Sequence, residues 1–410
     1  MVEPPKTSIS RSELVAILAM LTATVAFSID AMLPVLPDIS ASLAPDAPNQ
    51  AQLVIATFVV GMGLGTLFAG PLSDTYGRHK IAICGAALYI AGALLGAIAP
   101  NLETMLIARA LQGVGAAGPR VVAVAITRDL FSGRQMARIV SFVMIVFTLV
   151  PVIAPSLGAA IAWAFGWRTI FYSFALFSVL SVGWLILRQP ETLHPDNHRP
   201  FRAKELWQGI REVFSNKQVT YAIFAQTLIY SMLFVALMSS QQIFDQGFGL
   251  GTSYPLWFGL CAAISATASL LNATIVVRIG MQKVVAWSLA IQIAISLAFV
   301  VTLTLLNLPY HIAFTAFFIW LVSVFYMAGL GIGNLNAVAM EPMGHMAGLA
   351  ASIISATATV ASVLVAAPIS LSFDGTPLPI ALGVLGAGIL SLTFVSRINN
   401  ADIADEASKP

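Results

Sequence analysis

Two charged side chains stand alone within long apolar stretches of this sequence, and together they could carry proton chemistry. Asp30 lies in AFSIDAMLPVLP, and Arg109 lies in the stretch that begins RALQGVG. A charge inside a membrane span costs several kcal/mol unless it is paired or faces water, so such residues are functional candidates by default. At the rise of an α-helix, Asp30 lies about 9 Å and Arg109 about 10 Å from the same membrane surface. The matched depths predict a pair between them, direct or through water, that lowers the cost of both.

A carboxylate in this setting is subject to two opposing influences. Burial favours the protonated acid, whereas a neighbouring arginine favours the charged form. That balance would let Asp30 gain and lose a proton as its surroundings change, so we predict that Asp30 is the proton-coupling carboxylate and Arg109 its partner. The alternative is a structural ion pair that never titrates, and the residues alone leave both open.

The composition indicates what kind of protein must hold these two residues. Of 410 residues, 58% are hydrophobic and only 9% are charged. A soluble domain usually carries about a quarter charged residues. The chain is therefore expected to be a polytopic membrane protein whose surrounding solvent is mostly lipid. The net charge of +2 gives no argument for a nucleic-acid partner.

Neither the cysteines nor the histidines predict a metal site or a cofactor. Cys84 and Cys261 lie in separate apolar segments without C-x-x-C spacing. His194 and His198 lie in a polar loop, where Pro195 prevents a helix that would place both on one face. No Ser/His/Asp set, carboxylate pair or phosphate-binding loop in the sequence indicates an enzyme.

Apolar segments of about 20 residues predict membrane-spanning helices. The expected fold is all-α, with twelve transmembrane helices in two pseudo-symmetric six-helix bundles around a central cavity. A polar connection, 189–218, separates a first bundle (1–188) from a second (219–397), and 398–410 forms a tail. Within the connection, Ala203–Phe214 is predicted to form an amphipathic helix at the membrane surface. The predicted spans are 13–36, 51–72, 80–99, 102–127, 136–162, 167–188, 219–243, 252–277, 282–306, 310–339, 347–371 and 376–397.

The distribution of Lys and Arg predicts the orientation of these spans. If the N-terminus is cytoplasmic, the loops on the outer side contain Arg168 as their only Lys or Arg. Basic residues beside spans favour the cytoplasmic side. We therefore expect both termini to be cytoplasmic.

The connection between the second and third spans, GPLSDTYGRHK, has an unusual arrangement. Gly70, Asp74, Gly77 and Arg78 follow the pattern Gly-x-x-x-Asp-x-x-Gly-Arg. An ordinary positive-inside loop would explain the basic residues but not this spacing. The stretch NATIVVRIGMQK, at 272–283, occupies the corresponding place in the second half and is a degenerate copy.

The fourth and fifth spans hold two further patterns. In span four, Gln112 lies three residues after Arg109 on the same helix face, and Gly113 follows it. Arg120 lies deeper, and we predict that it lines an inner cavity rather than extending to the membrane surface.

Span five contains VPVIAPSLGAAI. Pro151 and Pro155 predict a bend, and Gly158 predicts a thin helix surface. The alternative is a proline-kinked helix with small-residue packing.

These patterns resemble the major facilitator superfamily. The loop pattern resembles the connection between its second and third helices, and Arg109, Gln112 and Gly113 match its fourth-helix signature, Arg-x-x-Gln-Gly. Span five resembles the antiporter signature Gly-Pro-x-x-Gly-Gly, in which Pro155 and Gly158 fit and alanines replace two glycines. The likeness is closest to the bicyclomycin- and chloramphenicol-resistance branch of the drug:proton antiporters. The stretches that carry it are SIDAMLPVLPDI, GPLSDTYGRHK, RALQGVGAAGPRVVAVAITRDLFSG, PVIAPSLG, GWRTIF and GNLNAVAMEPMGHMAGLAASI.

The resemblance implies a proton-coupled antiporter of the bacterial inner membrane that exports drug-like or small metabolite molecules. It implies proton coupling by Asp30 and locking of the outward-open state by Asp74 and Arg78. For the lock, we predict that Asp74 caps the N-terminus of the eleventh span near Ala347. A proton-coupled importer of a specific nutrient remains the alternative, and a membrane enzyme or receptor is a third. The expected partners are the substrate, protons and the lipid bilayer, and a monomer suffices.

The substrate cavity of such a transporter should lie between the two halves, near the membrane midplane. Aromatic and methionine side chains suit varied apolar ligands, and amides within a span require polar partners. For each candidate the alternative is a position that faces lipid or packs between helices. The candidates are Phe27, Phe58, Arg120, Met144, Tyr230, Phe234, Asn334 and Asn336.

Overall fold

The computed structural model describes residues 9–194, 196, 198, 200–306 and 308–407. Side chains are described for these residues except at 134, 137 and 399–407. Pro195 and the last residues of the predicted tail, 408–410, lie outside this range. Every regular element within the described range is a helix, which confirms the predicted all-α fold.

Eleven described stretches are long and apolar enough to span a membrane, and one of them, Tyr310–Leu371, contains two helices. The twelve predicted spans therefore correspond to twelve long helices in the described chain. Their bounds are α1 (Arg11–Asp30), α3 (Leu53–Tyr76), α4 (Arg78–Ala97), α5 (Leu102–Leu130), α6 (Gly133–Phe165), α7 (Thr169–Arg188), α9 (Lys217–Gln242), α10 (Tyr254–Ile279), α11 (Met281–Leu305), α12 (Tyr310–Met340), α13 (Ala347–Leu371) and α14 (Leu378–Ala407).

Two predicted boundaries differ from those in the structure. The first predicted span, 13–36, is not one helix, because α1 ends at Asp30 and a 3₁₀ turn and a short helix follow it. The last helix, α14, extends to Ala407 and takes in much of the predicted tail. The shorter elements are α2 (Leu36–Leu43), α8 (Ala203–Ser215), the 3₁₀ turns Leu33–Val35, Pro48–Gln52, Gly251–Ser253 and Glu341–Met346, and the π turn Ile243–Gly247.

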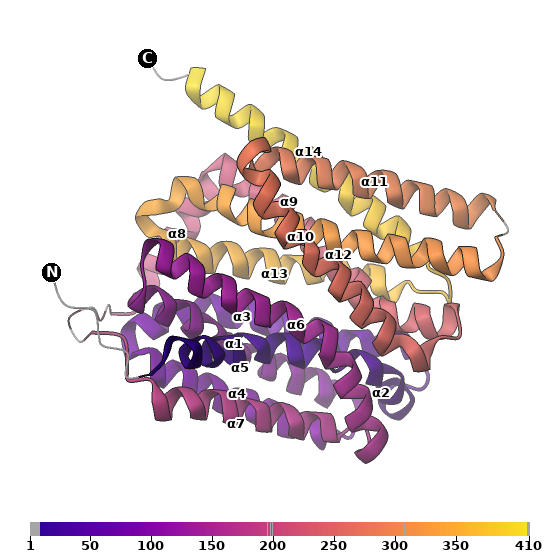
Figure 1. Cartoon of the computed structure of the whole chain (residues 1–410), viewed down its shortest axis with the longest axis horizontal. Coiled ribbons are helices and arrows are strands. Elements are labelled where there is room, and N and C mark those ends of the chain that lie inside the picture. Colours follow the sequence, from indigo (N-terminus) through magenta and orange to yellow (C-terminus); the bar gives the residue numbers. More distant parts are fainter. Residues whose placement is uncertain (1–8, 195, 197, 199, 307, 408–410) are drawn as a thin grey trace. The chain divides into compact units, whose positions relative to one another are not determined.

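The chain divides into two compact units, unit 1 (Met1–Ala203) and unit 2 (Lys204–Pro410). Figure 1 shows unit 1 in indigo to magenta and unit 2 in the later colours of the bar, with long helices running side by side within each unit. The predicted polar connection, 189–218, is shared between them. Its first part belongs to unit 1, and its amphipathic helix belongs to unit 2.

The predicted amphipathic helix exists as α8 and packs on unit 2. Val213 is buried on its inner side, and a Cβ atom at Gly209 would lie 2.6 Å from the Leu349 side chain of α13. Trp207 remains exposed on another side. Close packing at Gly209 explains why the helix follows unit 2 rather than unit 1.

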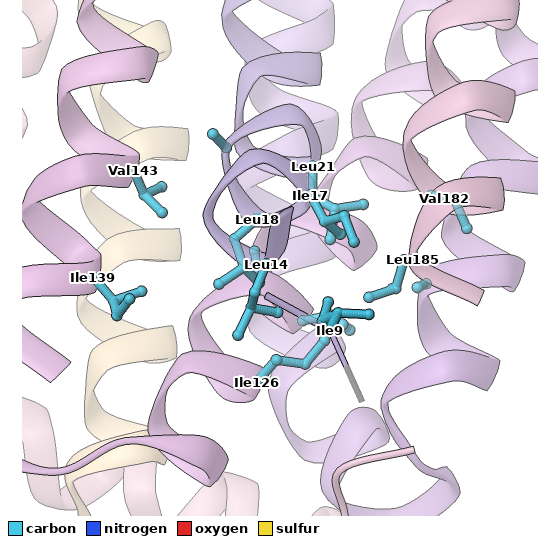
Figure 2. Packing of buried hydrophobic residues seen from close by; sticks show 14 of the residues in the cluster. Ile9, Leu14, Ile17, Leu18, Leu21, Ile126, Ile139, Val143, Val182 and Leu185 are labelled. Carbon is cyan, nitrogen blue, oxygen red and sulfur yellow. The ribbon is translucent and has the colours of Figure 1, made fainter. Parts of the chain in front are cut away.

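Helix α1 lies at the centre of unit 1. Most of its side chains from Leu14 onward are buried, on all sides of the helix, which is typical of a helix enclosed by its neighbours. At one end, its side chains pack against α5, α6 and α7 (Figure 2). This packing holds α1 between its neighbours and so places Asp30, at its other end, inside the unit. The labelled cluster consists of Ile9, Leu14, Ile17, Leu18 and Leu21 with Ile126, Ile139, Val143, Val182 and Leu185.

Glycines bring α5 into backbone contact with the helices on two of its sides. A Cβ at Gly113 would lie 2.0 Å from the carbonyl oxygen of Phe58 in α3. A Cβ at Gly115 would lie 2.3 Å from the backbone nitrogen of Tyr89 in α4. Small residues permit this approach, which is a common way to pack helices in membranes. The side chains of α5 therefore have closely defined positions relative to α3 and α4.

In unit 2, helices α11 and α12 meet through a buried polar and aromatic contact. The indole N–H of Trp320 donates to Ser296 Oγ at 3.1 Å, and Gln292 Nε2 donates to the same oxygen at 3.1 Å. The Trp320 ring stacks on Phe299, with ring centroids 5.3 Å apart. The contact satisfies the indole N–H, which needs an acceptor when it is buried.

Candidate functional site

The site is built around the break at the end of α1. Pro34 lies four residues after Asp30 and has no N–H to donate to the Asp30 carbonyl, so the helix cannot continue through this turn. The chain tightens instead: the Met32 N–H donates to the Ile29 carbonyl at 3.2 Å, three residues back. In a regular α-helix that N–H would bind the Ser28 carbonyl. The break therefore leaves the Ser28 carbonyl available to a side-chain donor.

Arg109 of α5 supplies that donor. Its guanidinium is fully buried and donates from Nη2 to the Ser28 carbonyl at 3.1 Å and from Nε to the Val54 carbonyl of α3 at 3.1 Å. It also donates from Nη1 to Gln112 Oε1 at 2.7 Å and lies 4.3 Å above the Phe58 ring. One cation thus joins α1, α3 and α5 through oriented oxygens and an aromatic face.

Asp30 lies at the same break but is not held in the same way. Its side chain is buried, with 6% exposed. Among the described residues, none forms a hydrogen bond or an ion pair with its carboxylate. The predicted direct pair with Arg109 is therefore not formed, because the donors of Arg109 are directed to the Ser28 and Val54 carbonyls and to Gln112. The two residues do share one depth, since Arg109 binds the carbonyl two residues before Asp30.

The sequence analysis did not identify two residues of this site, Ser28 and Tyr89. Ser28 donates from Oγ to the Thr24 carbonyl at 2.6 Å, and the same oxygen is hydrogen-bonded to the Tyr89 hydroxyl of α4. Both side chains are fully buried. A tyrosine hydroxyl within an otherwise apolar span was the available signal, because a buried hydroxyl requires a partner.

The proposed antiporter signature lies against the same break. A Cβ at Gly158 of α6 would lie 2.1 Å from the carbonyl oxygen of Ala31, the residue after Asp30. Pro155 and Pro151 lie one and two turns before Gly158, respectively, within α6, which continues through both. The sequence reasoning treated span five separately from Asp30, and the fold brings the two together.

The loop between α3 and α4 forms a second polar cluster. Gly77 has φ +99°, a conformation that glycine adopts without strain, and this places Arg78 at the start of α4. The buried Arg78 guanidinium donates to Asp74 at 2.5 Å and to Asp129 of α5 at 2.8 Å and 3.2 Å. Asp74 and Arg78, four residues apart in the loop pattern, therefore form an ion pair. Asp129 is an additional member that only the fold reveals.

A family model, the Major Facilitator Superfamily, matches residues 18–366 of this chain. The chain belongs to this superfamily. It is accordingly a membrane transporter rather than an enzyme, and the twelve helices and the signatures around Asp30 and Arg78 are parts of a transporter fold.

Individual superfamily members agree with this assignment. The chain is 29% identical over 335 residues to a bicyclomycin resistance protein homolog of Haemophilus influenzae, covering 80% of this chain and 81% of that one. It is 30% identical over 336 residues to the multidrug resistance protein MdtL of Klebsiella pneumoniae, covering 80% of each. The crystal structure of a D-xylose-proton symporter matches the fold with a TM-score of 0.73 at 16% identity, over 94% of this chain and 97% of that one.

Glu191 joins the segment after α7 to the start of α4. Its Oε1 accepts the Arg78 backbone N–H at 3.1 Å, and its Oε2 accepts the His79 N–H at 2.9 Å. These are the first N–H groups of α4, which lack acceptors inside the helix. The next residue, Thr192, donates from Oγ1 to Asp129 at 2.9 Å. The connection between the two units is therefore anchored to unit 1 at the Arg78 loop.

Glu191→Gln should lower the thermal unfolding midpoint of the purified protein. Burial opposes the charged form of Glu191, but backbone N–H groups of His79, Leu193 and Arg78 outweigh it and lower the pKa of the carboxyl. A lowered pKa in the folded state contributes stability above the ordinary value of 4.5, and that stability is lost as the pH falls through the folded value. Losing a helix-capping acceptor costs about 0.5–2 kcal/mol.

Scanning fluorimetry in detergent would test this capping contact. The deficit of Glu191→Gln should be present at pH 7 and shrink only as the pH falls below 4.5 and through the lowered pKa of the folded state, where the wild-type carboxyl becomes protonated. Glu103→Gln, an exposed carboxylate in the first turn of α5, is the matched control and should change little. Equal midpoints for wild type and Glu191→Gln at pH 7 would contradict the assignment.

Some of the predicted cavity residues pack inside the protein, and the others have varied surroundings. Those that pack internally are Phe27, against Phe174 and Phe177, Phe58, beneath Arg109, and Asn334, which donates to Asn272 at 2.8 Å. Phe58 is fully buried, so its role here is to face the guanidinium rather than an opening. The other candidates share no single setting. Arg120 Nη1 lies 3.6 Å from Met62 Sδ, and Met144 is exposed. The rings of Tyr230 and Phe234 stack with centroids 5.9 Å apart, and the last candidate is Asn336.

Proposed function

We propose that this chain is a proton-coupled antiporter that exports drug-like or small metabolite molecules across the bacterial inner membrane. The observation that carries the proposal is Asp30: a buried carboxyl at a break in α1, with no partner among the described residues. A carboxylate in a permanent ion pair would stay ionised, whereas a buried acid without one can take up a proton and release it when its surroundings change.

The direction of transport is supported by two features. Gly158, from the stretch that resembles the antiporter signature, lies against Ala31, directly after Asp30. The relatives in Haemophilus influenzae and Klebsiella pneumoniae carry the names bicyclomycin resistance protein homolog and multidrug resistance protein. A nutrient importer with the same fold is the second candidate, because the D-xylose-proton symporter shares the fold. At 16% identity that likeness concerns the fold alone.

In the proposed cycle, Asp30 changes its protonation state and Arg109 keeps its charge. Arg109 donates to two backbone carbonyls, so it holds α1, α3 and α5 together in either state. Protonation removes the charge of Asp30 and with it the cost of placing an anion in an apolar interior. Export then requires that protons enter from the outer side while substrate leaves from the cytoplasmic side.

The remaining parts of the proposal concern orientation and assembly. Both termini lie in the cytoplasm, as the placement of Lys and Arg predicts. The Asp74–Arg78 loop then lies on the cytoplasmic side. A single chain suffices for transport, since a two-unit fold can alternate access by itself.

Asp30→Asn is expected to abolish gradient-driven transport while the fold is retained. The amide keeps the size of the carboxyl and cannot titrate. In inverted vesicles with an acidic interior, accumulation of substrate should fall to the level of empty vesicles, and a downhill flux of substrate should persist. In cells, a growth-inhibition panel should identify a compound that is tolerated only with Asp30 present.

Asp46→Asn is the matched control, because Asp46 is an exposed carboxyl in the loop before α3. It should transport like the wild type. Unchanged proton-driven accumulation by Asp30→Asn would remove Asp30 from the mechanism. Uptake driven by a proton gradient in right-side-out vesicles, without exchange, would favour the importer.

A further inference from the structure

Tyr89 lies at the middle of α4 with no exposed surface. Its hydroxyl reaches across to α1 and is hydrogen-bonded to Ser28 Oγ. The direction of this bond follows from the second contact of Ser28. The Ser28 hydroxyl donates its hydrogen to the Thr24 carbonyl at 2.6 Å, and a carbonyl can only accept. Ser28 Oγ must therefore accept from Tyr89, and Tyr89 is a neutral donor with a fixed hydroxyl direction.

The backbone of Tyr89 is itself closely held. The α5 backbone approaches it at Gly115, where a Cβ would lie 2.3 Å from the Tyr89 nitrogen. One turn further along α4, a Cβ at Gly92 would lie 2.6 Å from the Gln112 nitrogen of α5. Both contacts are to backbone atoms, which cannot rotate aside as side chains do. Tyr89 is therefore a rigid point from which the end of α1 is held.

Ser28 is consequently fixed at two places by two helices. Tyr89 of α4 binds its hydroxyl, and Arg109 of α5 binds its carbonyl. Asp30 is only two residues further along the chain, and no described residue holds its carboxyl directly. The place of Asp30 at the end of α1 is therefore set through Ser28.

We propose that Tyr89 is a positioning residue for the proton-coupling site: its hydroxyl, through Ser28, holds in place the last turn of α1, which carries Asp30. This inference rests on the proposed function of Asp30. It adds a residue of α4 that neither touches the carboxyl nor belongs to any of the signature stretches.

Arg109 is the charged side chain that the described contacts place at this break. The other helices packed there contribute groups that do not titrate near neutral pH. Helix α3 brings the Val54 carbonyl and the Phe58 ring, α6 brings Gly158, and α7 packs its Phe174 ring on Phe27. A change in the pH dependence of transport would therefore report on Asp30 and its immediate surroundings.

Tyr89→Phe tests the proposal because it removes only the hydroxyl. The pH at which proton-driven exchange is half-maximal should move by about 0.5–1 unit, and the rate at pH 7 should fall about two- to tenfold, as expected for the loss of one buried hydrogen bond. The assay is substrate accumulation by the full-length protein in liposomes, with the internal pH varied. Tyr172→Phe, an exposed tyrosine of α7, is the matched control and should leave the profile unchanged.

Ser28→Ala provides a second route if Tyr89→Phe does not fold. It breaks the same bond from the other side and should shift the profile in the same direction. Since both changes act on one bond, the double variant should shift the profile no further than the larger single shift. Additive shifts would overturn the proposal.

The outcomes separate this inference from the proposed function. If the wild type shows no pH-linked flux, the proposed function itself fails. If the wild type is pH-linked and Tyr89→Phe lowers only the melting temperature, with an unchanged pH midpoint, Tyr89 is merely a packing residue and the inference is overturned. A shifted midpoint in both single variants supports it.

Discussion

Arg109→Lys is expected to abolish transport, although the charge is retained. A lysine ammonium is a compact group on a flexible stem and cannot reproduce the planar fork of a guanidinium. At this position the guanidinium donates to three acceptors at once. Its Nη2 donates to the Ser28 carbonyl, its Nε to the Val54 carbonyl and its Nη1 to Gln112 Oε1. A single ammonium can reach at most part of this set. Each buried acceptor that is left without a donor lowers the stability by about 1–3 kcal/mol.

The effect on transport should exceed the effect on folding. The carbonyls of Ser28 and Val54 would relax towards other donors, and the last turn of α1 would lose its link to α5. Because Asp30 lies two residues beyond Ser28, the coupling geometry would change with it. We expect the accumulation rate to fall about 100-fold or more, which corresponds to the loss of two such contacts in the transport barrier.

The control for this variant is Arg188→Lys. Arg188 is partly exposed and pairs with Glu13 at 2.7 Å and 3.2 Å, so it is also a bidentate arginine. An exposed pair contributes little, and the substitution should change the rate less than twofold. Both proteins are compared in liposomes at equal protein content after size-exclusion chromatography. Transport by Arg109→Lys at the wild-type rate would show that only the charge matters.

The spans could be predicted from the sequence because their signal is local. Each apolar run is long enough to cross the bilayer, and apart from the end of the first span and the end of the last, boundaries agree to within a few residues, as for the span 347–371 and α13. The break at Asp30 also has a local cause in Pro34, yet an apolar run through Leu36 conceals it. Hydropathy measures the length of a membrane segment and is insensitive to where its hydrogen bonds stop.

The partners of the charged residues could not be predicted in the same way. Equal depth suggested that Arg109 pairs with Asp30, but Arg109 donates instead to a carbonyl freed by the break and to a carbonyl of α3. Backbone acceptors leave no trace in the sequence. Glu191 and Asp129 were missed for a related reason. They meet Arg78 from positions 113 and 51 residues away, a proximity that only the tertiary fold creates.

Gly158→Ala should impair transport more than the addition of one methyl group would suggest. The new Cβ would lie 2.1 Å from the Ala31 oxygen, 2.8 Å from its carbonyl carbon and 2.9 Å from its Cα. All three are backbone atoms at the break, so no side-chain rotation can relieve the contact. Helix α6 or the turn after Asp30 must move by about 1 Å, and overpacking of this kind costs about 1–3 kcal/mol.

A displacement of about 1 Å at a reacting group can reduce a rate by about 100-fold. Here the displaced atoms adjoin Asp30, so we expect proton-driven accumulation to fall about tenfold or more and the melting temperature to fall as well. Gly183→Ala is the matched control. It is the same substitution inside α7, where a Cβ meets nothing within 4 Å, and it should be neutral or slightly stabilising.

The two readouts distinguish what the glycine contributes. If Gly158→Ala lowers the melting temperature but each folded molecule still accumulates substrate at the wild-type rate, Gly158 serves packing alone. If the rate falls while downhill flux persists, the close approach of α6 to the break is part of coupling. The second result would explain physically why a glycine is needed there: no residue with a side chain lets α6 contact the chain directly beside the acid.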